Sequence, residues 1–135
     1  MKINLEMAER VIAAAKQAVA DNGFPPMSIS IVDDTGHLVG FARMDGTFIG
    51  AIDVAHRKAR SAALFRADTA VLGQHFKPGS PAYSLENSNG GLIGFGGGVV
   101  LRGANDEPIG AVGVSGGSVE EDEIVAKAAA SRLAK

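Results

Sequence analysis

The chain is 135 residues long, 46% of them apolar, with a formal net charge of −2 and no cysteine. This length fits one domain, residues 1–135, the apolar content argues against disorder, and the acidic balance without a basic run argues against nucleic acid as a partner. The missing cysteines exclude disulfides and Cys-ligated metal centres, and the lack of an apolar signal core or of a run near about 18 apolar residues predicts a cytoplasmic chain with no membrane partner.

The first half of the chain predicts a helix, a β-hairpin and a second helix. Apolar residues recur at helical spacing over Leu5–Asn22, just before a glycine and a pair of prolines. Met27–Val32 alternates apolar residues with serine, residues 33–36 suit a turn, and His37–Arg43 is typical of the partner strand. Helical spacing of mostly small apolar residues returns over Ile49–Phe65.

The second half predicts three further strands and a final helix. A short helical turn at Ala70–Leu72 leads into a long loop, His75–Asn89, and long loops in compact domains are often functional. The strands are expected at Leu92–Phe95, Gly98–Arg102 and Ile109–Ser115, followed by a helix over Val119–Leu133. Because hairpin connections dominate, we expect an α+β fold: a five-stranded, mainly antiparallel sheet flanked by helices.

The final strand and helix are joined by a glycine turn that admits two interpretations. Gly116 and Gly117 permit a sharp reversal, and Ser118 precedes Glu121 by three residues, the capping-box pattern. Such a helix start can bind an anion. However, the run of carboxylates from Glu120 to Asp122 would repel one, so a well-capped helix packed on the strand is the favoured interpretation.

Residues 89–98 form a glycine-rich segment. It fits no nucleotide-binding pattern, because no GK[ST] sequence follows it and predicted strands rather than a helix flank it. Successive glycines can present backbone N–H groups to a carboxylate or a flat ligand. They also suit a strand that bends around a crossing helix. Both interpretations stay open, and under the first the ligand-binding residues are Asn89, Gly96, Gly97 and Gly98.

Single histidines and cations are the other candidates for chemistry. The three histidines, His37, His56 and His75, have no metal-ligand spacing, so no metal site is predicted. Arg43 and Lys58 are candidates to bind a carboxylate, although solvated ion pairs are the favoured explanation of such residues.

One hypothesis joins several of these residues in a catalytic cleft. In it, the hairpin and the long loop converge at one rim of the sheet, with His37 or Asp33 as base and Arg43 holding the substrate. His56 and Lys58 join as ligand-binding residues from the second helix or from a neighbouring subunit. The alternative is that Arg43 pairs with Asp45 and His37 is merely solvated.

Four motifs resemble the GlcG/HbpS family, which includes the C-terminal domain of PduO-type proteins. They are VDDTGHLVGFARMDG at Val32–Gly46, AHRKA at Ala55–Ala59, NSNGGLIGFGGG at Asn87–Gly98, and IGAVGVSGGSVEED at Ile109–Asp122. The resemblance implies a profilin-like α/β/α sandwich that assembles as a homo-oligomer, from dimer to octamer. It also implies association with haem or corrinoids, sometimes with haem degradation, or with catabolism of small unsaturated acids.

Three function classes follow from the residues and the resemblance. The first, which we favour, is a protein that binds haem or a related tetrapyrrole, with an imidazole as axial ligand and cations for the propionates. The second is a small lyase, isomerase or hydrolase acting on an unsaturated carboxylic acid, a small anionic substrate. The third is a structural or regulatory subunit. The alanine-rich final helix and the 5% aromatic content independently favour a homo-oligomer.

Overall fold

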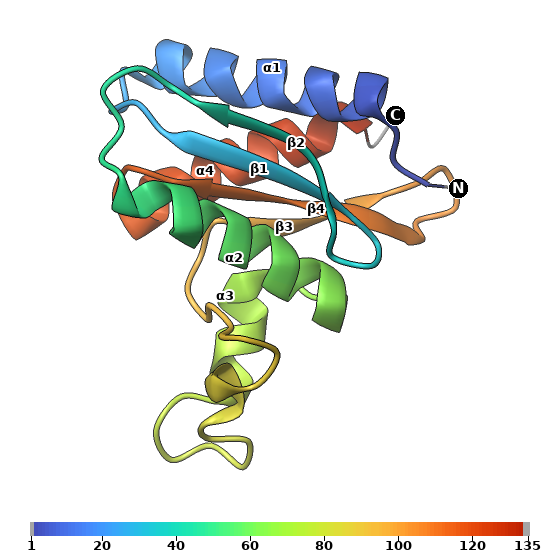
Figure 1. Cartoon of the computed structure of the whole chain (residues 1–135), viewed down its shortest axis with the longest axis vertical. Helices are drawn as coiled ribbons and strands as arrows, with labels where there is room; N and C mark the ends of the chain where they lie inside the picture. Colours follow the sequence, from blue (N-terminus) through green and yellow to red (C-terminus); the bar gives the residue numbers. More distant parts are fainter. Residues whose placement is uncertain (1, 134–135) are drawn as a thin grey trace.

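The structure, a computed structural model, describes residues 2–133; the ends of the predicted domain, residues 1 and 134–135, lie outside that range. The chain forms four α-helices, four strands and three 3₁₀ turns within it (Figure 1). In order they are α1 (Leu5–Asn22), β1 (Ser28–Asp33), β2 (Leu38–Arg43), α2 (Gly50–Phe65), α3 (Thr69–Leu72), η1 (Gly73–His75), η2 (Leu85–Asn87), β3 (Gly98–Arg102), β4 (Pro108–Ser115), α4 (Val119–Ala130) and η3 (Ser131–Leu133).

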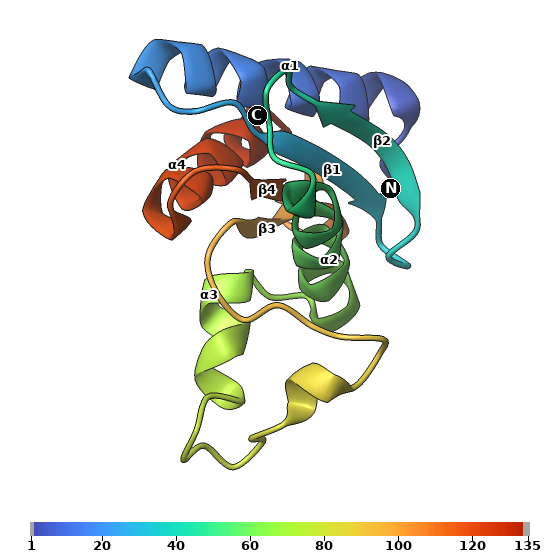
Figure 2. The same ribbon diagram turned by 60° about the vertical axis from the view of Figure 1, so that its left-hand side comes forward.

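The sheet is antiparallel throughout, in the order β2-β1-β4-β3. Helices α1 and α4 pack on one face, and α2 packs on the other across β1, β4 and β3 (Figures 1 and 2). The main apolar core lies between the sheet and the α1–α4 layer, and a smaller cluster of alanines and valines lies under α2. None of the helices within residues 2–133 is long and apolar enough to cross a membrane.

The α+β class and the antiparallel sheet are confirmed, but the prediction of a fifth strand at Leu92–Phe95 is wrong. That segment packs on α2 and α3 instead: Ile93 N–H donates to Ser61 Oγ at 3.0 Å, and the buried Leu92 joins a small apolar cluster with Leu72 and Phe76. The β3 edge is also partly closed to a fifth strand, because the N–H groups of Gly98 and Val100 already donate to Thr69 Oγ1 and Asp68 Oδ1.

Local capping explains where the helices begin and end. The side chain of Asn4 accepts from Met7 N–H at 2.8 Å, and Gly23 ends α1 in the left-handed conformation. Ser118 and Glu121 form the predicted capping box at the start of α4. The glycine turn before α4 is therefore closed by the chain's own groups, since Asp122 Oδ1 also accepts from Gly117 N–H at 2.9 Å.

The segment between α3 and β3 forms a lobe that extends away from the sheet (Figures 1 and 2). Two arginines of α2 bind the part of this lobe that leads back to the sheet. Arg57 donates to the carbonyl of Gly90, and Arg60 donates to the carbonyl of Asn89 at 2.6 Å. The predicted long loop at His75–Asn89 is thus a loop with short 3₁₀ turns, anchored to α2 at its far end.

Candidate functional site

A histidine of α2, His56, contacts a serine of β1, Ser30, where the helix packs on the sheet. His56 Nδ1 lies 3.0 Å from the hydroxyl of Ser30, which is fully buried on β1. Burial lowers the pKa of the half-buried His56, and the nearby charge of Arg60 lowers it further, against an opposing effect of Asp53. The imidazole is therefore neutral at neutral pH, and its Nε2 has no hydrogen-bond partner within residues 2–133.

The uncovered part of this face belongs to β2, because α2 packs mainly on the other three strands. Antiparallel pairing sets Phe41 opposite Ser30 and Arg43 opposite Ser28, so both side chains lie on the face that His56 approaches. Arg43 is exposed, and its guanidinium makes no hydrogen bond or ion pair within residues 2–133, so the alternative pair with Asp45 is not formed there. The buried hydroxyl of Ser28 also lacks a partner in this part of the chain.

The hairpin turn is a self-contained polar network. Asp33 Oδ1 accepts from the N–H groups of Thr35 and His37 and from the Thr35 hydroxyl at 2.6 Å, and Thr35 Oγ1 lies 2.8 Å from His37 Nδ1. Burial opposes ionisation of Asp33, but these hydrogen bonds together outweigh it and lower its pKa. The turn thereby orients the exposed ring of His37 through Nδ1 and leaves Nε2 open.

The sheet register separates the residues of the hypothesised catalytic cleft. His37 precedes β2 and Arg43 ends it, so the two lie at opposite ends of the strand, roughly 20 Å apart at about 3.3 Å per residue. Asp33 and His37 lie together at the hairpin turn. Arg43 instead shares its end of the sheet with Gly98, because Ser28 pairs with Ser115 and Gly98 pairs with Gly113. One cleft within a single protomer does not bring all three catalytic candidates together.

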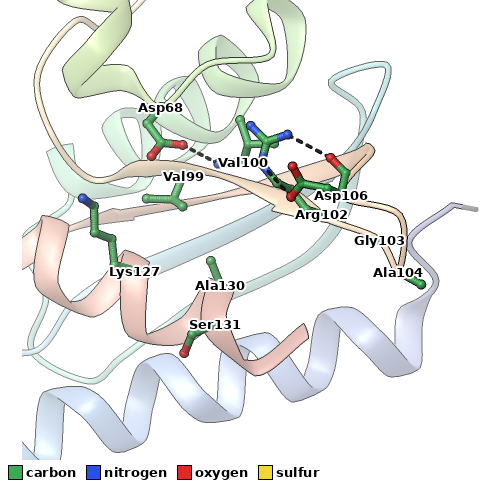
Figure 3. A pocket seen from close by; sticks show the side chains of 10 residues that line it. All are labelled: Asp68, Val99, Val100, Arg102, Gly103, Ala104, Asp106, Lys127, Ala130 and Ser131. Carbon is green, nitrogen blue, oxygen red and sulfur yellow. Dashed lines mark hydrogen bonds and ion pairs between the residues drawn. The ribbon is translucent and has the colours of Figure 1, made fainter. Parts of the chain in front are cut away.

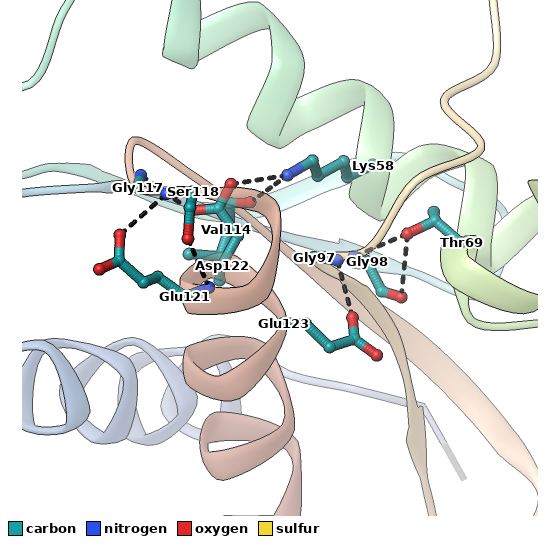
Figure 4. A network of polar contacts seen from close by, with 10 residues as sticks. All are labelled: Lys58, Thr69, Gly97, Gly98, Val114, Gly117, Ser118, Glu121, Asp122 and Glu123. Atoms are coloured by element: carbon teal, nitrogen blue, oxygen red, sulfur yellow. Dashed lines mark hydrogen bonds and ion pairs between the residues drawn. The ribbon is translucent and has the colours of Figure 1, made fainter. Parts of the chain in front are cut away.

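Lys58 of α2 forms a buried ion pair between the helix and the sheet, which sequence patterns did not indicate (Figure 4). Its Nζ contacts Asp122 Oδ2 at 3.0 Å and donates to the carbonyl of Val114 at 2.8 Å, with both side chains almost wholly inaccessible. The ring of Phe95 covers the amine, with its centroid 5.1 Å away. Burial lowers the pKa of Lys58 and raises that of Asp122, each against the attraction of its partner.

Gly97 and Gly98 lie against this ion pair, and their N–H groups already donate within the chain (Figure 4). Gly97 N–H donates to Glu123 Oε1 at 2.8 Å, and Gly98 N–H donates to Thr69 Oγ1 at 2.9 Å. A Cβ at Gly97 would lie 2.5 Å from Lys58 Nζ. This geometry favours close packing over an open anion nest. A ligand-binding role for Gly96, Gly97, Gly98 and Asn89 stays a prediction.

Three partners in this site were missed because each pairs across a long sequence separation. Ser30 and His56 are 26 residues apart, Gly97 and Glu123 are also 26 apart, and Lys58 and Asp122 are 64 apart. The one signal in the sequence was the position of Lys58 around the axis of its helix, which is nearer the sheet than that of Arg57 and is consistent with a buried amine. His75 is exposed in the loop. Within residues 2–133 no group of three or more histidines and acids could hold a metal ion.

Comparison with known proteins covers nearly the whole chain. Residues 3–131 match the model of the family described as haem degrading protein HbpS-like. An uncharacterized 15.0 kDa protein of Citrobacter freundii is 36% identical over 96% of this chain and 95% of its own. Protein GlcG of Escherichia coli K12 is 38% identical over 84% of this chain and 81% of its own.

A match to a third relative covers only part of that protein. The corrinoid adenosyltransferase PduO of Salmonella typhimurium is 34% identical, over 80% of this chain but 32% of its own length. Among solved structures, Klebsiella pneumoniae ORFY superposes with a TM-score of 0.92 at 32% identity, over 98% of this chain and 92% of its own. A PduOC–haem complex superposes with a TM-score of 0.90 at 29% identity, over 98% and 96%. The chain therefore belongs to the HbpS-like family, as its GlcG/HbpS motifs predicted.

Proposed function

We propose that this protein binds haem or a closely related tetrapyrrole. The observation that carries the proposal is the likeness to the PduOC–haem complex, which extends over 98% of this chain and 96% of that one. The family description, which names haem, supports the same ligand class. A small anionic substrate for a lyase is less well supported, because the N–H groups of Gly97 and Gly98 that would stabilise an enolate already donate to Glu123 and Thr69.

Two residues beside the part of the sheet face that α2 leaves uncovered, His56 and Arg43, suit this ligand. A neutral imidazole with one nitrogen already hydrogen-bonded is the form that ligates iron, and His56 meets both conditions through its lowered pKa and its contact with Ser30. Arg43 is an exposed cation on the same face and suits a propionate. Bound haem would supply an iron centre. The chain's own part is to orient it through His56 and to balance its charge through Arg43.

His37 is the competing axial ligand in this proposal. Its ring is oriented by Thr35 in the same way that Ser30 orients His56, but it lies at the other end of β2 and is exposed. A haem at His37 would need apolar cover from a second subunit. His75 has no comparable hydrogen bond from its ring within residues 2–133, and it serves as the matched histidine control.

The test is a titration of purified protein with haemin, followed by the Soret band. His56→Ala should shift the band and weaken binding, whereas His75→Ala should leave both unchanged. Arg43→Gln should weaken binding without moving the band, since it removes a propionate contact only. If His37→Ala rather than His56→Ala changes the spectrum, the axial assignment is wrong but haem binding stands. If the parent protein gives no saturable Soret band, the proposal fails.

Two finer properties of the proposal are measured on the same samples. Light scattering with and without haemin tests the expected homo-oligomer. Incubation of the haem complex with oxygen and a reductant, followed by the loss of the Soret band and by mass spectrometry of the pigment, tests a haem-degrading role. A stable Soret band under these conditions would limit the function to binding.

A further inference from the structure

Three arginines from distant parts of the sequence line one small pocket on the side of the sheet away from α2. They are Arg10 of α1, Arg102 at the end of β3 and Arg132 of η3. The pocket has a volume of about 180 Å³. Its remaining walls are Gly103 and Ala104 of the β3–β4 turn and an apolar floor of Met7, Ile109 and Leu133.

The fold explains why these arginines meet. Met7 and Arg10 lie one helical turn apart, so the apolar side chain enters the core while the guanidinium lies at its margin. Arg102 pairs with Pro108 where the β3–β4 ladder becomes irregular, next to the fully buried Ile109. The chain end then returns past α1 through η3, which carries Arg132.

These positive charges have little compensation. In the part of the chain that the structure describes, no acidic side chain lines the pocket. Arg10 and Arg132 are exposed and make no hydrogen bond or ion pair within residues 2–133. Among residues 2–133, Arg102 is held only by Asp106, through a hydrogen bond of 3.1 Å to the carbonyl and a loose 3.9 Å contact to the carboxylate (Figure 3). Such grouping of like charge is unexpected in a chain whose net charge is −2.

The adjoining pocket shows the contrast. It has a volume of about 370 Å³, shares Arg102, Gly103 and Ala104, and lies between β3 and α4 (Figure 3). There the cations Arg102 and Lys127 are offset by the carboxylates of Asp68 and Asp106, so its lining is balanced. Of these two pockets, only the smaller has an excess of positive charge, because its lining adds Arg10 of α1 and Arg132 of η3 and no carboxylate among the described residues.

We propose that this three-arginine pocket binds a small polyvalent organic anion, one that carries two or more carboxylates or a phosphate ester. Guanidinium groups bind carboxylate and phosphate oxygens in bidentate fashion, which accounts for three arginines and no lysine. The apolar floor suits the carbon skeleton of such a ligand. The pocket lies on the α1–α4 side of the sheet, whereas His56 approaches from the α2 side, so this site is independent of the proposed haem site.

Calorimetric titration of the whole chain at constant ionic strength tests the proposal, with citrate and a sugar phosphate as probes and acetate as the monovalent reference. Arg10→Gln and Arg132→Gln should each weaken binding of the probes about tenfold, which corresponds to about 1.4 kcal/mol at 25 °C, since each removes a charge-assisted hydrogen bond to the anion. Lys16→Gln removes the same charge from the exposed side of α1, away from the pocket, and should leave the affinity unchanged.

The outcomes separate this site from the others. Preferential binding of citrate or the sugar phosphate that is lost in both arginine variants and kept in Lys16→Gln supports the site. Equal affinity for acetate and the polyvalent probes, or equal loss in Lys16→Gln, overturns it. A change of oligomeric mass in the arginine variants, with no anion binding, would identify the cluster as a subunit contact and also overturn it. Haemin titration of the arginine variants should match the parent, so failure of either proposal is visible by itself.

Discussion

Replacing Lys58 by methionine should destabilise the fold strongly. The side chain of Lys58 is fully buried and that of Asp122 is 4% exposed, so the change leaves a carboxylate in the interior with no other cation of the described residues within ion-pair distance. Removing one partner of a buried ion pair costs about 3–5 kcal/mol. A domain of this size has a free energy of unfolding of about 5–15 kcal/mol, so the loss is a large share of the total.

A second substitution and an exposed ion pair provide the controls. Adding Asp122→Asn to Lys58→Met removes the stranded charge and keeps the oxygen that accepts from Gly117 N–H, so part of the stability should return. Lys127→Met breaks the pair with Glu123 on the same helix, 3.5 Å long and with Lys127 62% exposed. That change should cost less than about 1 kcal/mol.

Urea denaturation followed by circular dichroism measures all four proteins, with stability taken from the midpoint and the slope. The expected order of stability is parent, Lys127→Met, double variant, Lys58→Met. If Lys58→Met costs no more than Lys127→Met, the amine does not hold this buried site together. If the double variant is no more stable than Lys58→Met, the loss arises from packing around Phe95 and Gly97 rather than from the stranded charge.

Two further predictions concern the same layer. Gly97→Ala adds a Cβ 2.5 Å from Lys58 Nζ at a φ of +119°, so the close contact and the backbone strain should together lower the free energy of unfolding by more than about 2 kcal/mol. Gly79→Ala is the control, because its φ is +87° but nothing lies within 4 Å of the added Cβ, so it should show the backbone strain alone. Equal shifts of the melting temperature in the two variants would contradict this. Because the pKa of His56 is lowered, the folded state binds fewer protons than the unfolded state just below the ordinary value of 6.5. Stability should therefore fall as pH decreases from about 7.5 to about 5.5, and fall less in His56→Gln; identical pH profiles would refute the reasoning.

Sequence patterns predicted most of the fold because its elements follow local rules. Alternation with serine located β1, and capping residues located α1 and α4. The segment at Leu92–Phe95 was misread because a short apolar run suits both a strand and a loop packed on helices. Only the position of Asp68 and Thr69 on the β3 edge decides between them.

The candidate site was less predictable because its contacts depend on register and on close approach between layers. Residue types identified His37, His56 and Arg43, but their grouping follows from the pairing of β1 with β2, which places Arg43 opposite Ser28 and far from His37. Lys58 was predicted as a ligand-binding residue, and that role stays a prediction; what the sequence did not indicate is the buried contact of its cation with Asp122. Periodicity gives the face of a helix, but it cannot give the partner that lies across the layer.

The glycines of the sheet connect these two levels. Gly113 of β4 lies directly beneath α2, where a Cβ would collide with the carbonyl of Ala55 and lie 2.5 Å from Ala59 N. Gly113 is also the register partner of Ser30 on β1. Because Gly113 has no side chain, the backbone of α2 can approach the sheet closely at this position. There His56, the neighbour of Ala55, contacts the hydroxyl of Ser30 at 3.0 Å. Gly113, which lies outside the glycine-rich segment 89–98, thus acts on the proposed site through packing, because it sets how closely α2 and His56 approach the sheet.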